Sequence, residues 1–389
     1  MGNAAKREYL FSIIERYRKA TRKEKKAILD EFCINCNYNR KYAIRILGVT
    51  TKKTRRKSGR KFTYHIPGVI QPLKAVWLTA DQPCSKRLVG MLPEWLPFYE
   101  QEYGILNLAD KAKLLSISAA TIDRILKPIR EKVQRKRFCT TRPGTLLKNQ
   151  IPIKTDHWDV TQPGFMEADS VAHCGNSTEG DYVNSVTMTD ILLTWTEVRA
   201  VWCKGAEGVL KQVQSIEESL PFPLLGFDAD NGSEFINHHF QRYFANKPNA
   251  TQFTRSRPYR KNDNAYVEQK NWTHVRHLFG YDRFEDPALV PLMNDLYANE
   301  WSLYQNHFCP TMKLIEKVRI NSKYKKRYDK PKTPYQRVLE CSHITEDKKK
   351  ELRAVHKTLN PFQLKKMINT KAKVIFKSVL LSTSPRKSI

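Results

Sequence analysis

The spacing of apolar residues predicts helices over the first fifty residues. Leu10, Ile13, Ile14 and Tyr17 recur at helical spacing. Thr21 and Glu24 have the form of a capping box, and a third helix is expected over 37–47, with Gly48 as its stop. This order is typical of a helix-turn-helix module in residues 1–50. A small helical bundle with a charged exterior has the same pattern.

A second helical block is predicted from about residue 67, and we assign residues 67–140 to it. In its last helix, Ser118 is placed to cap the first turn. The apolar positions that share one face of this helix are Ile122, Ile125, Leu126 and Ile129. A turn followed by such a helix is again typical of a DNA-recognition motif. Pro128 lies within the helical pattern and can kink or end the helix, so the pattern does not define its last residue.

From about residue 164 the pattern changes to short β-rich runs. The runs are FMEADSVA, DYVNSVTM, WTEVRAVW and PLLGFDA, and they alternate later with helical stretches near 205–219 and 233–246. The order predicts an α/β domain over residues 155–290, with a mixed sheet flanked by helices.

Beyond about residue 285 the chain is expected to be helical again, then basic and irregular, over residues 291–389. After Glu351 it has no acidic residue, whereas nine Lys or Arg remain. This tail repels itself unless an anion covers it.

The net charge of +29 on 389 residues predicts a polyanionic partner. A membrane surface is one such polyanion, but neither an apolar run of spanning length nor a signal peptide is recognisable. We therefore expect a soluble protein in the cytoplasm. Residues 51–66 are read as a basic linker, because residues 51–61 hold seven basic residues and no acid. Arg55, Arg56 and Lys57 are its candidate DNA contacts.

The eight cysteines are scattered, without the dense spacing of a secreted disulfide framework. Reduced thiols in a cytosolic compartment are the simpler interpretation. Cys33 and Cys36 are spaced like half of a zinc site, but no second Cys or His pair follows at finger spacing. An ordinary helix end is the alternative for this pair.

Three acidic residues are candidates for catalysis. Asp169 lies in the first β-rich run. Asp230 lies at the carboxyl end of a strand, where Asn231 and Gly232 turn the chain, and ligand sites of open α/β sheets favour that edge. Glu268 is expected on a helix whose sheet-facing positions are Val267, Asn271, Val275 and Leu278.

Other acids nearby have alternative interpretations. Glu167 and Asp228 each lie two residues before an assigned aspartate and share its strand face, so they are the alternatives if the register is wrong. Asp263 is interpreted as a loop residue or a helix cap.

These motifs resemble the DDE transposases and retroviral integrases. That family has an Asp in its first core strand, an Asp in a D-N-G-x-E-F turn and a Glu on a helix about 35 residues later. Here the turn reads DNGSEF, and Asp230 and Glu268 are 38 positions apart (268 − 230), while Asp169 precedes Asp230 by 61 (230 − 169). The resemblance covers roughly residues 160–320.

The resemblance implies an RNase H-like fold in which Asp169, Asp230 and Glu268 converge. It also implies that these carboxylates bind catalytic Mg²⁺, with Mn²⁺ as a substitute, since hard cations prefer carboxylate oxygen. The implied activity is that of a prokaryotic insertion-sequence transposase, a DNA-bound homo-oligomer that acts on double-stranded element ends and target DNA. An RNase H-like nuclease without strand transfer and a non-catalytic DNA-binding regulator are the rival hypotheses.

Further basic residues are candidate DNA contacts. In the first module these are Arg40, Lys41 and Arg45. Near Glu268, Lys270 and His274 are four residues apart and would share a helical face toward DNA. The neighbouring basic residues are Arg255, Arg257, Arg260, Lys261 and Arg276. Tyr259, Tyr266 and Trp272 interrupt them, and a core position is the alternative for the last two.

Overall fold

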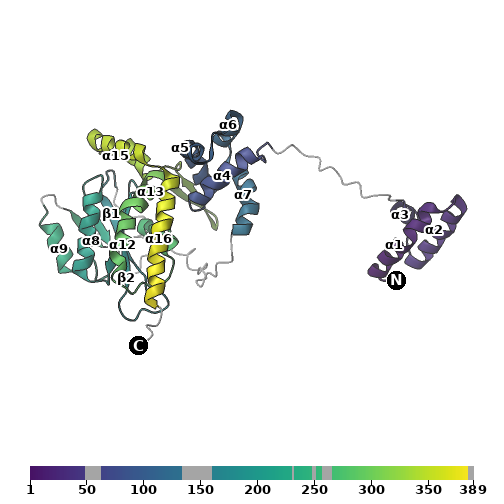
Figure 1. The fold of residues 1–389 in the computed structure, drawn as a ribbon, viewed down its shortest axis with the longest axis horizontal. Helices are drawn as coiled ribbons and strands as arrows, with labels where there is room; N and C mark the ends of the chain where they lie inside the picture. Colours follow the sequence, from purple (N-terminus) through teal and green to yellow (C-terminus); the bar gives the residue numbers. More distant parts are fainter. Residues whose placement is uncertain (49–62, 134–159, 230–231, 248–250, 256–264, 384–389) are drawn as a thin grey trace. The chain divides into compact units, whose positions relative to one another are not determined.

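The computed structural model describes residues 1–48, 63–133, 160–229, 232–247, 251–255 and 265–383, and the chain divides into two compact units, residues 1–62 and 63–389. In the first unit the expected three helices are α1 (Asn3–Lys19), α2 (Arg22–Cys36) and α3 (Arg40–Leu47) (Figure 1). The capping box at the start of α2 is confirmed. The third helix begins later than expected, because Asn37 adopts a left-handed conformation that ends α2 and Asn39 caps α3.

The second unit begins with four helices, α4 (Pro67–Thr79), α5 (Ser85–Tyr103), α6 (Leu108–Ser116) and α7 (Ala119–Val133). Ser118 accepts a hydrogen bond from the Thr121 N–H, and α7 continues through Pro128. These helices pack on the rest of the unit: Trp95 Nε1 donates to the Phe308 carbonyl at 3.2 Å, and Tyr304 donates to the Thr79 carbonyl at 2.7 Å.

A five-stranded sheet is the centre of the unit. Its strands are β1 (Phe165–Ala172), β2 (Val183–Asp190), β3 (Thr196–Trp202), β4 (Gly226–Ala229) and β5 (Gln252–Arg255). Their order is β3-β2-β1-β4-β5, in which β1, β2 and β3 are antiparallel and β1, β4 and β5 are parallel. This is the order of an RNase H-like sheet, so the predicted fold class is confirmed.

Helices cover both faces of the sheet (Figure 1). On one face, Met166, Ala168 and Phe227 pack with α8 (Ala206–Ser219) and α9 (His238–Ala245). The other face is covered by a helical run in which α10 (Ala265–Lys270) passes into the π-helix η2 (Asn271–Arg276) and then α11 (His277–Phe279). A second run follows on that side, α12 (Leu289–Leu296), the π-helix η3 (Tyr297–Trp301) and α13 (Ser302–Phe308).

The outer edge of β3 is closed by side chains instead of a further strand. The Asn306 amide accepts from the Thr196 N–H and donates to its carbonyl, both at 3.0 Å. Asn294 pairs with the Ala200 backbone in the same way, at 2.6 and 3.0 Å. Since an open edge pairs readily with other chains, these asparagines block it and fix α12 and α13 beside the sheet.

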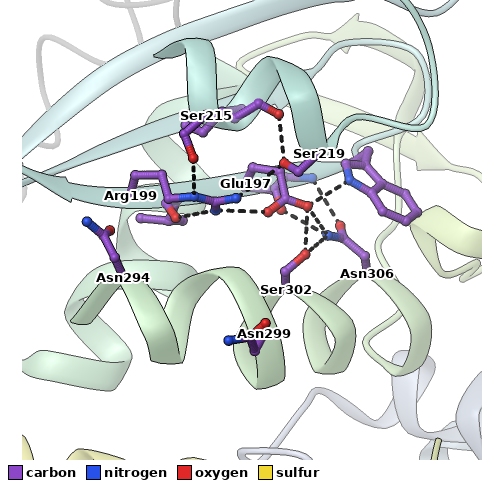
Figure 2. Close-up of polar contacts among 12 residues, drawn as sticks. Glu197, Arg199, Ser215, Ser219, Asn294, Asn299, Ser302 and Asn306 are labelled. Atoms are coloured by element: carbon purple, nitrogen blue, oxygen red, sulfur yellow. Dashed lines mark hydrogen bonds and ion pairs between the residues drawn. The ribbon is translucent and has the colours of Figure 1, made fainter. Parts of the chain in front are cut away.

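Beside that edge lies a buried ion pair, Glu197 with Arg199 at 3.3 Å (Figure 2). Burial raises the pKa of Glu197, and Arg199 and the donor Ser302 oppose this. Arg199 also donates to two serines of α8, Ser215 and Ser219. A buried charge pair needs such additional partners to offset its desolvation, so this cluster joins α8, β3 and α13.

The C-terminal region differs from the irregular structure expected. It contains a hairpin of β6 (Leu314–Ile320) and β7 (Lys323–Tyr328), followed by α14 (Pro334–Glu340), α15 (Glu346–Thr358) and α16 (Pro361–Thr383). Helix α16 runs beside α12 (Figure 1). Lys365 of α16 forms an ion pair with Asp81 at 2.6 Å. Among the described residues, no helix is both long and apolar enough to cross a membrane.

Buried histidines make the stability of this unit depend on pH. Burial lowers the pKa of His173 to about 3, and that of His307 likewise to about 3. The folded state keeps both neutral, whereas the unfolded chain takes up protons below a pKa of about 6.5. The unfolding free energy therefore falls as pH drops below 6.5, by about 1.4 kcal/mol per pH unit and per histidine.

We predict that the unfolding free energy of His173→Gln falls less steeply with decreasing pH than that of the unmodified protein. Between pH 6.5 and 5 the two slopes should differ by about 1.4 kcal/mol per pH unit. Urea unfolding followed by tryptophan fluorescence measures this, because every tryptophan lies beyond residue 63. Identical pH slopes for the two proteins would show that His173 is protonated in the folded state.

Candidate active site

Strand β1 carries apolar and acidic residues in alternation. Met166 and Ala168 are fully buried toward α8 and α9, whereas Glu167 and Asp169 face the side covered by α10. Glu167 is buried and Asp169 is half-buried. The strand thus presents one acid beneath the covering helix and the next acid nearer to solvent.

Two hydrogen bonds fix the helical run of α10 and η2 against β1. The Glu167 carboxylate accepts from the backbone N–H of Val267 at 3.0 Å, in the first turn of α10. Asn271 Nδ2 donates to Asp169 Oδ2 at 2.6 Å. A carboxylate at a helix N-terminus is favoured by the helix dipole, so the buried Glu167 anchors the start of α10.

Glu268 is exposed and precedes Asn271 by three residues. Side chains three apart lie on the same face of a helix. Because Asn271 contacts Asp169, the helix turn that carries Glu268 lies at Asp169. The structure therefore brings the neighbourhoods of Asp169 and Glu268 together.

Asp230 lies outside the described residues. Strand β4 ends at Ala229, which is paired with Ala168 of β1. The motif after it is anchored by Glu234, whose carboxylate accepts from Ser170 at 2.8 Å and from Lys204 at 3.0 Å. Burial alone raises the pKa of Glu234, but hydrogen bonds from its own N–H, Lys204 and Ser170 outweigh it and lower the pKa.

The two alternative acids have structural partners. Asp228 accepts a hydrogen bond from Thr254 of β5 at 2.8 Å, and it is paired with Glu167 in the parallel register. Glu167 is 1% exposed and holds the Val267 N–H. Each of these acids thus contacts a neighbouring element of the fold. Asp263 lies outside the described residues.

Across the described residues, no three His, Cys, Asp or Glu side chains form a group that could hold a metal ion. Cys33 and Cys36 lie in the last turn of α2, where Cys36 is fully buried, so the helix-end interpretation holds for this pair. The acids that face α10 remain the oxygen donors suited to a hard cation.

The expected surface position of Lys270 and His274 is wrong. They are 8% and 4% exposed: Trp301 of η3 donates to the His274 carbonyl at 2.9 Å and its ring contacts the His274 ring, so η3 lies over this face of the helix. Burial lowers the pKa of Lys270 to about 7, and Lys270 Nζ donates to the Thr194 carbonyl at 3.4 Å. Burial also lowers the pKa of His274 well below its ordinary value, so it is a neutral core residue.

The other basic candidates have mixed positions. Lys41 and Arg45 are exposed on α3, whereas Arg40 forms an ion pair with Asp30 of α2. Trp272 is 47% exposed, so the core alternative is wrong for it. Arg276 donates to the Ala172 carbonyl at 3.0 Å. The candidates outside the described residues are Arg55, Arg56, Lys57, Arg257, Tyr259, Arg260 and Lys261; the side chains of Arg255 and Tyr266 also lie outside the description.

Sequence reasoning missed the roles of Asn271 and Glu234. Asn271 was expected only to face the sheet, yet its amide holds Asp169. Glu234 belongs to the DNGSEF motif and anchors that turn to β1. The signal for Asn271 was its spacing of three from Glu268, and the signal for Glu234 was its place in the motif.

No protein-family model matches the chain. The chain is 37% identical over 338 residues to the uncharacterized protein y4rM of Sinorhizobium fredii (strain NBRC 101917 / NGR234), a match that covers 86% of this chain and 95% of y4rM.

Among solved structures, the catalytic core domain of BIV integrase matches 46% of this chain and 96% of its own, at 15% identity and a TM-score of 0.28. The HTLV-2 integrase catalytic core domain in complex with magnesium (dimeric form) matches 45% of this chain and 97% of its own, at 16% identity and a TM-score of 0.28.

We predict that Glu234→Ala lowers the unfolding free energy by about 2 kcal/mol, because it removes a buried carboxylate and leaves Ser170 without its acceptor. Urea unfolding measures the change. Glu207→Ala removes an exposed glutamate from α8 and is the matched control, with a change within about 0.5 kcal/mol. Equal changes in the two variants would contradict the anchoring role.

Proposed function

We propose that this chain, which belongs to the same family as y4rM of Sinorhizobium fredii, is a DNA transposase of the DDE type. It binds the double-stranded ends of a mobile element, cuts the DNA there and joins the freed 3′ ends to target DNA. The observation that carries the proposal is the 2.6 Å hydrogen bond from Asn271 to Asp169, which brings the helix with Glu268 to the strand with Asp169.

Asp169, Asp230 and Glu268 are proposed as the catalytic acids. The parallel pairing of Ala168 with Ala229 supports this set, since Asp169 and Asp230 each directly follow one member of that pair. Burial supports the same register on β1, because Glu167 is 1% exposed beneath α10 whereas Asp169 is half-buried. Glu268 completes the set from α10.

The donor set fits a hard divalent cation. It consists of carboxylates alone, and Asn271 orients Asp169 through a neutral amide instead of a competing cation. We propose that Asp169, Asp230 and Glu268 bind Mg²⁺, or Mn²⁺ in its place. When bound, such ions supply Lewis-acid stabilisation of charge on the phosphate oxygens during in-line displacement.

The DNA-binding part of the proposal rests on the helical modules. On α3, Lys41 and Arg45 are exposed together with Tyr42 and Ile44, so one helix face offers both cations and apolar groups to a groove. On α7, Arg124 and Lys127 are exposed after the turn at Ser118. Because two element ends must be paired, the protein is proposed to act as a homo-oligomer on DNA.

We predict that Asp169→Asn, Asp230→Asn and Glu268→Gln each abolish strand cleavage while retaining DNA binding and the thermal unfolding midpoint. Cleavage of a labelled element end with Mg²⁺ or Mn²⁺ measures this, and Ca²⁺ should permit binding with little cleavage. Asp228→Asn is the matched control: it keeps an oxygen acceptor for Thr254 and should remain active. If Asp228→Asn is inactive and Asp230→Asn is active, the second catalytic acid is Asp228 instead of Asp230.

We predict that the protein joins a precut element end to target DNA, which separates a transposase from a nuclease. The 3′ hydroxyl oxygen attacks a target phosphorus, and the bond from that phosphorus to the target's 3′ oxygen breaks. An end with a 3′ deoxy terminus should bind equally well but form no joined product, and Glu268→Gln should join neither end. Robust cleavage of uncut ends without any joined product would identify a nuclease instead.

A further inference from the structure

The β6–β7 hairpin forms a two-stranded sheet of its own in the described part of the chain. Its apolar residues Val318 and Ile320 are 44% and 52% exposed, and no residue of either strand is buried. An isolated two-stranded hairpin is marginally stable in water. The ribbon therefore needs another surface to cover it.

The charge of the ribbon points to the kind of surface. Residues 314–328 contain six Lys or Arg and one acid, Glu316, which is paired with Arg327 at 3.0 Å. In the antiparallel register, Lys317 is opposite Lys326, and Arg319 is opposite Tyr324. Cross-strand partners share a face, so these four residues form one face, here called the acid-free face.

The acid-free face carries three cations and no acid. Lys317 lies over the Tyr324 ring at 4.4 Å, and burial with the neighbouring Lys326 lowers the pKa of Lys317. Like charges directly opposite each other destabilise a hairpin. A polyanion would remove that repulsion, whereas an identical ribbon from a second copy would add to it.

The root of the ribbon is fixed beside the helix that carries Glu268. Lys313 Nζ donates to the Leu192 carbonyl at 2.9 Å, and the Thr311 and Thr194 hydroxyls are 2.8 Å apart. The Thr194 carbonyl also accepts from Lys270 of α10. The turn between β2 and β3 thus holds both the ribbon and α10, which ties the orientation of the ribbon to the candidate active site.

We propose that the β6–β7 ribbon is an arm that binds duplex DNA through its acid-free face. A two-stranded ribbon is one of the elements that the major groove of duplex DNA admits, and its lysines and arginine reach phosphates. The identity of the DNA as element or target rests on the proposed function, but the binding of duplex DNA by the ribbon does not.

The test uses the full chain with Lys317→Gln, Arg319→Gln and Lys326→Gln combined. The matched control carries Lys348→Gln, Lys350→Gln and Lys357→Gln, which remove the same charge from α15. Binding to a labelled duplex is measured at several salt concentrations, with a chelator present to prevent cleavage. The readout therefore does not depend on catalytic activity. The ribbon variant should bind roughly 10-fold to 100-fold more weakly, and its slope of log affinity against log salt should be shallower by about 2 to 3.

Equal losses in the two variants would show a general charge effect and overturn the arm. A ribbon variant can instead bind DNA normally and sediment differently from the unmodified protein in the absence of DNA. That result would show that a second copy covers the ribbon, and it would overturn the DNA-binding role of the ribbon. If the ribbon variant loses DNA binding while the unmodified protein neither cuts nor joins DNA, the arm stands and the transposase proposal fails. Circular dichroism verifies that both variants are folded.

Discussion

The architecture of the candidate site depends on the burial of the Glu167 carboxylate under α10. A carboxylate that is 1% exposed needs a donor, and the Val267 N–H in the first helical turn supplies it. The bond fixes where the helix begins on the sheet. Asp169 lies two residues after Glu167 in β1, and Asn271 lies four residues after Val267 in the helix. The side chains of Asp169 and Asn271 therefore meet. The positions of Asp169 and of the helix turn with Glu268 follow from the same docking.

Much of this sheet could be predicted from sequence, because its strands are short runs rich in β-forming residues that are separated by turn residues. The run FMEADSVA coincides with β1, and the DNGSEF motif follows directly where β4 ends. The closure of the β3 edge could not be predicted. Asn294 and Asn306 look like ordinary helix residues in the sequence, and only the fold shows that their amides replace a missing strand. Their role depends on contacts about a hundred residues away.

The error at Lys270 and His274 has a physical origin in the same long-range packing. Helical spacing places them on one side of the helix, and their polar character suggests that this side faces solvent. The chain after residue 288 returns as α12, η3 and α13, and Trp301 of η3 packs on His274. Lys270 is buried as well, and burial lowers its pKa. Local pattern identifies a helix face, but it does not identify what later packs on it. The basic ribbon illustrates the reverse case, because a segment expected to be irregular forms paired strands.

For the proposed site of carboxylates, it matters that the donor to Asp169 is the neutral amide of Asn271. A lysine at this position would also hold Asp169, but its charge would compensate the carboxylate and weaken its attraction for a cation. An amide orients the carboxylate while leaving its negative charge intact. Asn271 is also the first residue of η2, and such π-helical turns occur frequently at functional sites. The helix thus changes its winding where it must direct one side chain to Asp169 and, three residues earlier, leave Glu268 exposed.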